Sequence, residues 1–224
     1  MLKAVAALLA ISLLVSCGEQ VTSVTKSRIL LLGDSMMAAN STGDNTVANG
    51  IEAILEEEVI DRSVIGARYF YRLPISGSAG LRLGAQYRPG TWDWIVLNGG
   101  GNDLLVGCGC HECETQLTRL VTPDGKNGAI PDFVTHLGTS GARVLYVGYL
   151  RNPGMATPIK ACGTAGDDLD QRLARMASLN SGVDFLDLSD LVPHGDTSFH
   201  SFDRIHPSPK GSHAIAAQIA VFIQ

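Results

Sequence analysis

Two stretches of the chain carry side chains that could perform nucleophilic chemistry. Ser35 ends the sequence Gly33-Asp34-Ser35, and His206 follows Asp203 by three residues near the other end of the chain. A serine hydroxyl becomes a good nucleophile only when an adjacent base removes its proton, and an imidazole is the usual base because its pKa lies near neutrality. A carboxylate bound to the far ring nitrogen fixes the tautomer of that imidazole. We therefore interpret Ser35 as a nucleophile, His206 as its base and Asp203 as the residue that orients His206.

The elements that must position these residues are visible as short apolar runs alternating with longer amphipathic segments. This alternation is typical of βαβ units around a parallel sheet. It predicts a single doubly wound α/β domain, with a flavodoxin-like five-stranded parallel sheet and helices on both faces. Ligands of such sheets bind where the carboxyl ends of the strands meet. Strands are predicted near residues 29–32, 59–65, 94–98, 144–149 and 183–186, and helices near residues 46–58, 81–87, 128–137, 168–179 and 208–223.

Four short motifs follow the predicted strands or lie near the end of the chain. Gly-Asp-Ser at residues 33–35 follows the first strand, Gly66 the second and Gly-Gly-Asn-Asp at residues 100–103 the third, while Asp203 and His206 come late. In this order the motifs resemble those of the SGNH/GDSL hydrolase family, and the resemblance covers residues 28–224. It implies the SGNH hydrolase fold and a serine esterase that works through an acyl-enzyme, with no metal or organic cofactor.

The resemblance also implies which groups stabilise the oxyanion of the tetrahedral intermediate. The family uses the backbone N–H of the nucleophile, a glycine N–H and an asparagine side-chain amide, which correspond here to Ser35, Gly66 and Asn102. Gly77 also resembles the glycine of the second motif, but it lies closer to the third predicted strand. Gly66 directly follows the second predicted strand and is therefore the preferred donor.

Other residues near the motifs have no evident chemical step. Asp34 and Asp103 belong to the motifs, and we expect them to order their loops. His200 lies close to His206 in the sequence and is expected to line the same pocket. Met36, directly after the nucleophile, is expected to pack beneath it or to line an acyl slot.

Four cysteines, Cys108, Cys110, Cys113 and Cys162, form an even set. In an exported protein such a set predicts two disulfides, whose connectivity the sequence leaves open among three possibilities. A zinc site is the alternative, because the cluster is dense in soft ligands. If Cys162 pairs with the cluster, it would clamp the loop that contains Asn102 to the loop after the fourth strand.

The first residues resemble the signal sequence of a bacterial lipoprotein. One lysine precedes an apolar run of about 12 residues, which is too short to span a bilayer but suits a signal sequence. The run ends in Ser16-Cys17-Gly18, which resembles a lipobox, where the cysteine is lipidated and becomes the mature N-terminus. The predicted segments are a signal peptide at 1–16, a tether at 17–27 and a hydrolase domain at 28–224.

Lipidation of Cys17 would anchor an exported protein to the cell envelope. Stable anchoring needs more than one acyl chain, which bacterial lipoproteins supply. Gly18 is not the aspartate that usually retains lipoproteins in the inner membrane, so the predicted location is the periplasmic face of the outer membrane.

Composition narrows the range of partners. The chain is 45% hydrophobic and 17% charged, with a formal net charge of −5, which fits a globular domain and argues against binding to nucleic acid. The substrate is therefore expected to be a small-molecule, lipid or polysaccharide ester, and the envelope location favours small acyl or acetyl groups. The alternatives are a lysophospholipase or lipase that acts on lipid esters and a non-catalytic binding module on the same fold. The sequence leaves the oligomeric state open.

Overall fold

The computed structural model of the chain describes residues 27–71, 77–151, 153–154 and 156–224. Residues 1–16 and Cys17 lie outside the described residues, so the signal sequence, the anchor and the division into segments stay predictions. Within the described ranges, no helix is long and apolar enough to cross a membrane.

The centre of the fold is a five-stranded sheet in the order β2-β1-β3-β4-β5, in which every neighbouring pair is parallel. This confirms the predicted fold class. The strands β2, β1 and β3 are neighbours in the sheet and are paired in line with one another: Ile29 of β1 lies opposite both Val59 of β2 and Trp94 of β3. The strands are β1 (Ile29–Leu32), β2 (Val59–Asp61), β3 (Trp94–Leu97), β4 (Arg143–Val147) and β5 (Val183–Leu186).

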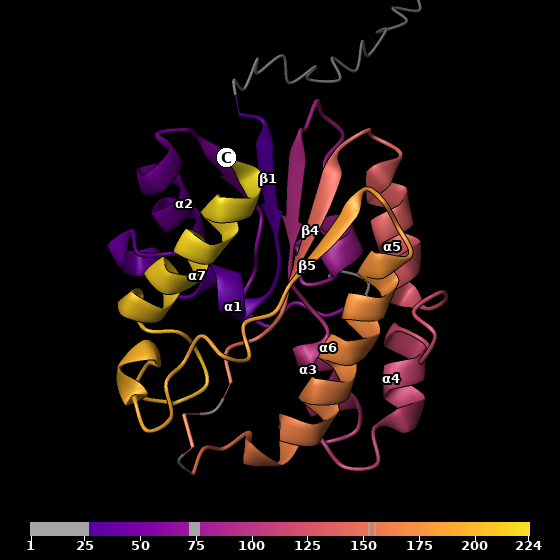
Figure 1. Cartoon of the computed structure of the whole chain (residues 1–224), viewed down its shortest axis with the longest axis vertical. Coiled ribbons are helices and arrows are strands. Elements are labelled where there is room, and N and C mark those ends of the chain that lie inside the picture. Colours follow the sequence, from indigo (N-terminus) through magenta and orange to yellow (C-terminus); the bar gives the residue numbers. More distant parts are fainter. Residues whose placement is uncertain (1–26, 72–76, 152, 155) are drawn as a thin grey trace, which may run out of the picture.

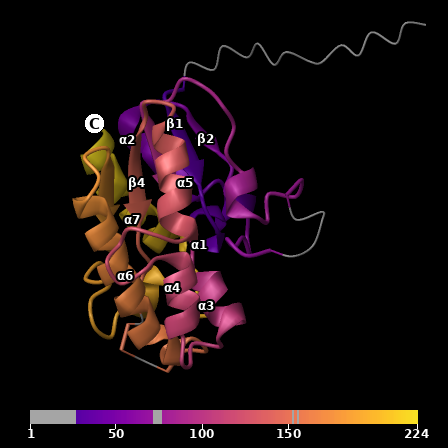
Figure 2. The same ribbon diagram turned by 90° about the vertical axis from the view of Figure 1, so that its right-hand side faces the viewer.

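Helices cover both faces of the sheet because its strands are apolar on both sides. All four residues of β1 are fully buried, and successive residues contribute to the two hydrophobic clusters on opposite faces. Helices α2 (Val47–Leu55) and α7 (Pro209–Ile223) lie side by side on one face, as Figure 1 shows. Figure 2 shows the helices of the other face: α3 (Gly101–Gly107), α4 (Glu114–Leu120), α5 (Ala129–Gly138) and α6 (Gly163–Ser178).

Local sequence signals fix where the two paired helices begin. α2 starts at Thr46, whose side chain accepts from the Asn49 N–H while Asn49 returns a bond in a capping box. α7 starts at Ser208, which caps the Gly211 N–H, with a proline in the first turn. The two helices approach closely at Gly50, where an added Cβ would lie 2.6 Å from the Cβ of Ala216.

Several predicted boundaries were wrong. The second strand ends at Asp61 rather than residue 65, because the Asp61 carboxylate accepts the Ser63 N–H and turns the chain. The helix predicted at 81–87 is only the 3₁₀ turn η3 (Leu83–Ala85), since the Gln86 side chain leaves this segment to bond both backbone groups of Gly33. α6 begins earlier than predicted, and α3 and α4 were not predicted. The remaining short elements are α1 (Ser35–Ala38), η1 (Ser41–Gly43), η4 (Lys160–Cys162) and η5 (Thr197–Phe199).

The four cysteines form two disulfides, Cys108–Cys113 and Cys110–Cys162. The pairing resolves the connectivity that the sequence left open. It also leaves none of the four as a free thiolate, so the alternative zinc site is wrong. The Cys110–Cys162 bond joins the segment after α3 to the start of α6, which is the clamp considered from the sequence.

Candidate active site

Ser35 lies where β1 ends and α1 begins. The Asp34 side chain caps this short helix, because its Oδ1 accepts the Met36 N–H at 2.9 Å. Ser35 is buried but lines a cavity of about 500 Å³. The strand end therefore presents the serine to a space large enough for a substrate group.

Asp203 and His206 lie in the loop before α7. The Asp203 Oδ2 lies 2.6 Å from the His206 Nδ1, and the Asp203 Oδ1 accepts the N–H groups of Ile205 at 2.9 Å and His206 at 3.0 Å. Burial opposes the charge of Asp203, but these hydrogen bonds outweigh it and lower the pKa of the carboxyl. Asp203 is thus held as a carboxylate against one ring nitrogen, which leaves Nε2 of His206 for proton transfer.

Ser35 and His206 line the same cavity. In the described part of the chain the Ser35 hydroxyl and the His206 ring make no direct hydrogen bond. Such bonds are often long without substrate and shorten only when substrate is bound. The structure therefore brings the predicted nucleophile and base to one cavity from opposite ends of the sequence.

Asn102 lies in the first turn of α3, after β3, and also lines the cavity. Its Nδ2 lies 3.2 Å from the Ala67 carbonyl oxygen and 3.4 Å from Asp34 Oδ2. Gly66 directly precedes Ala67 and has a φ of 78°, a conformation that favours glycine. A Cβ added at Gly77 would meet only Arg82 and Ala85. The geometry therefore places the turn of Gly66, not Gly77, next to Asn102.

Asp103 orders the turn that follows Gly66, as expected. Its two carboxylate oxygens accept the N–H groups of Tyr69 and Phe70, each at 2.9 Å. Burial raises the pKa of Asp103, and the two backbone bonds oppose that rise. The residue ties the loop after β2 to the helix that carries Asn102.

The cavity that contains Ser35 and His206 has a largely apolar wall. Met36 lines the cavity, which is one of the two positions expected for it. His200 does not line the cavity, so the expectation that it would is wrong. His200 is buried, its Nδ1 has no partner among the described residues, and burial lowers its pKa. The apolar wall residues are Met36, Leu104, Leu105, Leu150, Ile159, Leu169 and Ile205.

Sequence reasoning missed the residues that follow β4. Tyr149 and Arg151 line the cavity, and Arg151 pairs with Asp167 at 3.0 Å and with the buried Asp170. Burial raises the pKa of Asp170 to about 7, although Arg151 opposes the rise. The sequence could have indicated these residues, because they follow β4, which neighbours β3, and the carboxyl ends of the strands hold the other predicted site residues.

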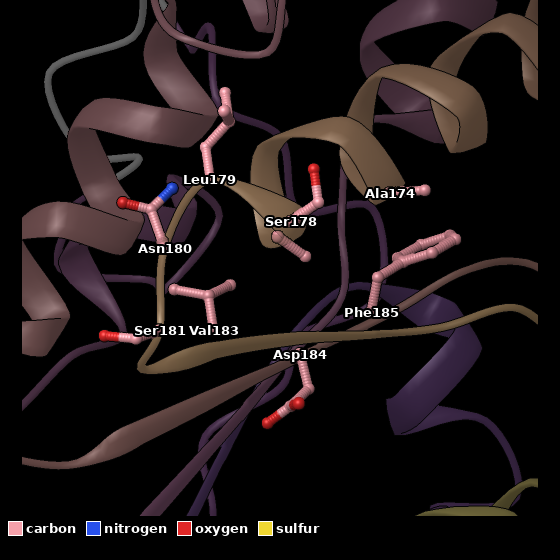
Figure 3. A pocket seen from close by; sticks show the side chains of 9 residues that line it. Ala174, Ser178, Leu179, Asn180, Ser181, Val183, Asp184 and Phe185 are labelled. Carbon is pink, nitrogen blue, oxygen red and sulfur yellow. The ribbon is translucent and has the colours of Figure 1, made fainter.

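A second cavity lies elsewhere, between the end of α6 and the start of β5 (Figure 3). Its volume is about 640 Å³, and its wall includes Asn180, Asp184 and Phe185. None of the site residues predicted from the sequence lines it. It lies at the amino end of β5, away from the strand ends that carry the predicted catalytic residues.

Comparison with known proteins shows the family and the fold of this chain. Residues 31–214 match the model of the GDSL-like lipase/acylhydrolase family, whereas no curated protein matches the chain. A solved lipase/acylhydrolase from Enterococcus faecalis is similar in fold, with a TM-score of 0.61, 17% identity and coverage of 88% of this chain and 95% of that one.

Two further solved structures share the fold. A lipase from a goat rumen metagenome has a TM-score of 0.58 and 19% identity. The match covers 87% of this chain and 96% of the lipase chain. An acetyl xylan esterase from Butyrivibrio proteoclasticus has a TM-score of 0.53 and 13% identity. The match covers 89% of this chain and 64% of the esterase. Together with the family match over most of the sequence, the fold identifies this chain as an ester hydrolase that belongs to the GDSL-like lipase/acylhydrolase family.

Proposed function

We propose that this chain is a serine esterase that forms an acyl-enzyme on Ser35. The observation that carries the proposal is the Asp203–His206 contact at 2.6 Å, because His206 lines the same cavity as Ser35 at the start of α1. A carboxylate, an imidazole and a hydroxyl assembled in this way can transfer an acyl group.

In the first half of the reaction, the Ser35 Oγ attacks the ester carbonyl and His206 Nε2 takes the serine proton. Asp203 stabilises the imidazolium that forms. His206 then gives the proton to the leaving alkoxide, which leaves an acyl group on Ser35. In the second half, a water molecule gives a proton to His206 and attacks the acyl carbonyl. His206 then returns this proton to the Ser35 Oγ as the acyl–serine bond breaks and the acid leaves.

The negative charge on the carbonyl oxygen needs preorganised donors. No described residue accepts the N–H of Ser35 or the N–H of Gly66, so both remain free to bind the oxyanion. The Asn102 amide completes the set of three donors. Its hydrogen bond to the Ala67 carbonyl supports this assignment, because it holds the amide beside the Gly66 turn.

Two classes of acyl group are consistent with the site. The expected envelope location favours small acyl or acetyl esters. A longer acyl chain is the second candidate, because the cavity of about 500 Å³ has apolar walls that include Leu104, Leu105 and Leu150. Proteins that share the fold include both a lipase and an acetyl xylan esterase.

Hydrolysis of p-nitrophenyl esters from acetate to decanoate tests the proposal. We expect Ser35→Ala to abolish turnover and fluorophosphonate labelling, because both need the nucleophile. Ser189→Ala is the matched control, since Ser189 also lines the cavity, and it should retain activity. The chain-length profile separates the two acyl classes. A wild-type protein with neither turnover nor labelling would contradict the proposal and favour a binding module.

A further inference from the structure

A hydrogen-bonded network joins three strand ends beneath the proposed oxyanion site. The Gly101 N–H donates to the Tyr149 Oη at 2.8 Å, and the Tyr149 hydroxyl contacts Asp34 Oδ2 at 2.7 Å. The Asn102 Nδ2 lies 3.4 Å from the same oxygen of Asp34. Asp34 directly precedes the nucleophile, Tyr149 follows β4, and Asn102 follows β3.

The direction of every hydrogen bond in this network is fixed. The Tyr149 oxygen already accepts the Gly101 N–H, so its own proton goes to the Asp34 carboxylate. The two groups near the Asn102 amide, Asp34 Oδ2 and the Ala67 carbonyl, are both acceptors. The NH₂ side of the Asn102 amide must therefore face them, and the orientation of the amide is determined.

The two donors to Asp34 Oδ2 are unequal. The tyrosine contact at 2.7 Å has the length of a strong bond to a carboxylate, whereas the asparagine contact at 3.4 Å is at the long limit. Tyr149 thus satisfies this oxygen without drawing Asn102 towards it. One Asn102 N–H remains weakly bound and can turn to an oxyanion at small cost.

We propose that Tyr149 is a positioning residue for ester hydrolysis. Its hydroxyl donates to Asp34 Oδ2, so this oxygen does not take a strong hydrogen bond from Asn102, and the Asn102 amide stays available for the oxyanion. The inference rests on the proposed function of Asn102. Without the hydroxyl, the buried Asp34 carboxylate would take a shorter bond from Asn102. The amide would then have to break that bond in each transition state.

The packing around Tyr149 allows the hydroxyl to be removed while the ring stays in place. A Cβ added at Gly101 would lie 2.7 Å from the Tyr149 ring carbon Cζ, so the ring packs directly on the helix start. Phenylalanine keeps this ring and removes only the hydroxyl. Tyr146→Phe is the matched control, because the buried Tyr146 hydroxyl bonds the Gly99 carbonyl and Tyr69 and does not bond Asp34.

We expect Tyr149→Phe to lower kcat roughly tenfold with KM unchanged, because the oxyanion forms only in the transition state. Tyr146→Phe should retain kcat. The pH at which Asp34 takes up a proton should also rise in Tyr149→Phe, and with it the acid limb of the kcat profile that Asp34 sets. Burial raises the pKa of Asp34, and so does the nearby Asp103 carboxylate, whereas the hydrogen bonds from Met36 and Tyr149 and the charge of His206 lower it. A merely structural loss would not move this limb.

A double-mutant cycle with Asn102→Ala separates the possible failures. If Tyr149 acts through Asn102, Tyr149→Phe should cost little further activity in the Asn102→Ala background. Equal losses in both backgrounds, or a loss confined to KM, would overturn the role of Tyr149. If Asn102→Ala itself had wild-type kcat, the proposed oxyanion site would be wrong instead.

Discussion

The carboxylate of Asp34, next to Ser35, and that of Asp203, which contacts His206, have opposite electrostatic surroundings. Burial raises the pKa of Asp34, against the hydrogen bonds from Met36 and Tyr149. At Asp203 the bonds from His206 and Ile205 outweigh burial and lower the pKa. As the pH falls, Asp34 therefore takes up a proton before Asp203 does. Asp203 therefore stays charged in conditions where Asp34, which lies 3.4 Å from the Asn102 amide, is protonated.

Asp170 offers a test of stability at the level of one residue. It is buried, its Oδ1 has no partner among the described residues, and burial raises its pKa from 3.8 to about 7 despite the nearby Arg151. Between about pH 4 and pH 7 the unfolded chain ionises first, so this group makes the folded state less stable as the pH rises.

We expect Asp170→Asn to remove that dependence. Relative to wild type, the free energy of unfolding of the variant should rise from about pH 4 to pH 7, by about 1–4 kcal/mol. Urea unfolding at several pH values measures this difference. Asp167→Asn is the control, because Asp167 is the exposed second partner of Arg151. Parallel pH profiles for wild type and Asp170→Asn would contradict the expectation.

The sequence predicted the triad residues because each lies in a short motif. The Asp203–His206 pairing spans three residues, so spacing alone could indicate it. Tyr149 and Asp34 are 115 residues apart, and their contact exists only because β1, β3 and β4 are neighbours in the sheet. No periodicity or local spacing encodes such a contact, which is why the network around Asn102 emerged only from the structure.

At the scale of elements, the two disulfides differ in the length of chain that they close. Cys110–Cys162 spans 52 residues and Cys108–Cys113 spans 5. Loop-closure entropy assigns about 4 kcal/mol to the longer loop and about 2 kcal/mol to the shorter. The longer bond also ties the segment after α3 to Cys162, which lines the cavity.

We therefore expect the Cys110→Ala/Cys162→Ala variant to lose more stability than Cys108→Ala/Cys113→Ala, by about 2 kcal/mol in the free energy of unfolding. It should also lose kcat, because α3 carries Asn102 and would no longer be tied to α6. Thermal or urea unfolding and ester hydrolysis of both variants measure this. Equal stability losses, or an unchanged kcat in the first variant, would refute the clamp.

The strands were easier to predict than the helices around the cavity. β1 and β5 match their predicted ranges. β1 is a short, continuous and fully buried apolar run, which is typical of a strand covered on both faces. α4 has only seven residues and starts directly after Cys113 without a side-chain cap, so it lacks the usual start signal. The segment at 81–87 has helical spacing, but the bonds from Gln86 to Gly33 hold it against β1 instead.

The whole molecule has two distinct ends. The described chain begins at the amino end of β1, where Arg28 bonds the Ile223 carbonyl at the end of α7 and pairs with Glu57. Ser35 lies at the carboxyl end of the same strand, as the positions of β1 and α1 in Figure 1 show. A tether that enters at the amino end of β1 would leave the cavity at the carboxyl end unobstructed.

This polarity makes anchoring and catalysis separable. In a Gram-negative host, we expect Cys17→Ser to move esterase activity from the membrane fraction to the soluble fraction, because the substituted residue cannot carry the acyl chains. The kcat/KM for a water-soluble ester should be the same for this variant and for a chain that starts at Ser27. Activity that still sediments with membranes would contradict the anchor. A lower kcat/KM in the shorter chain would mean that residues before Ser27 contribute to the site.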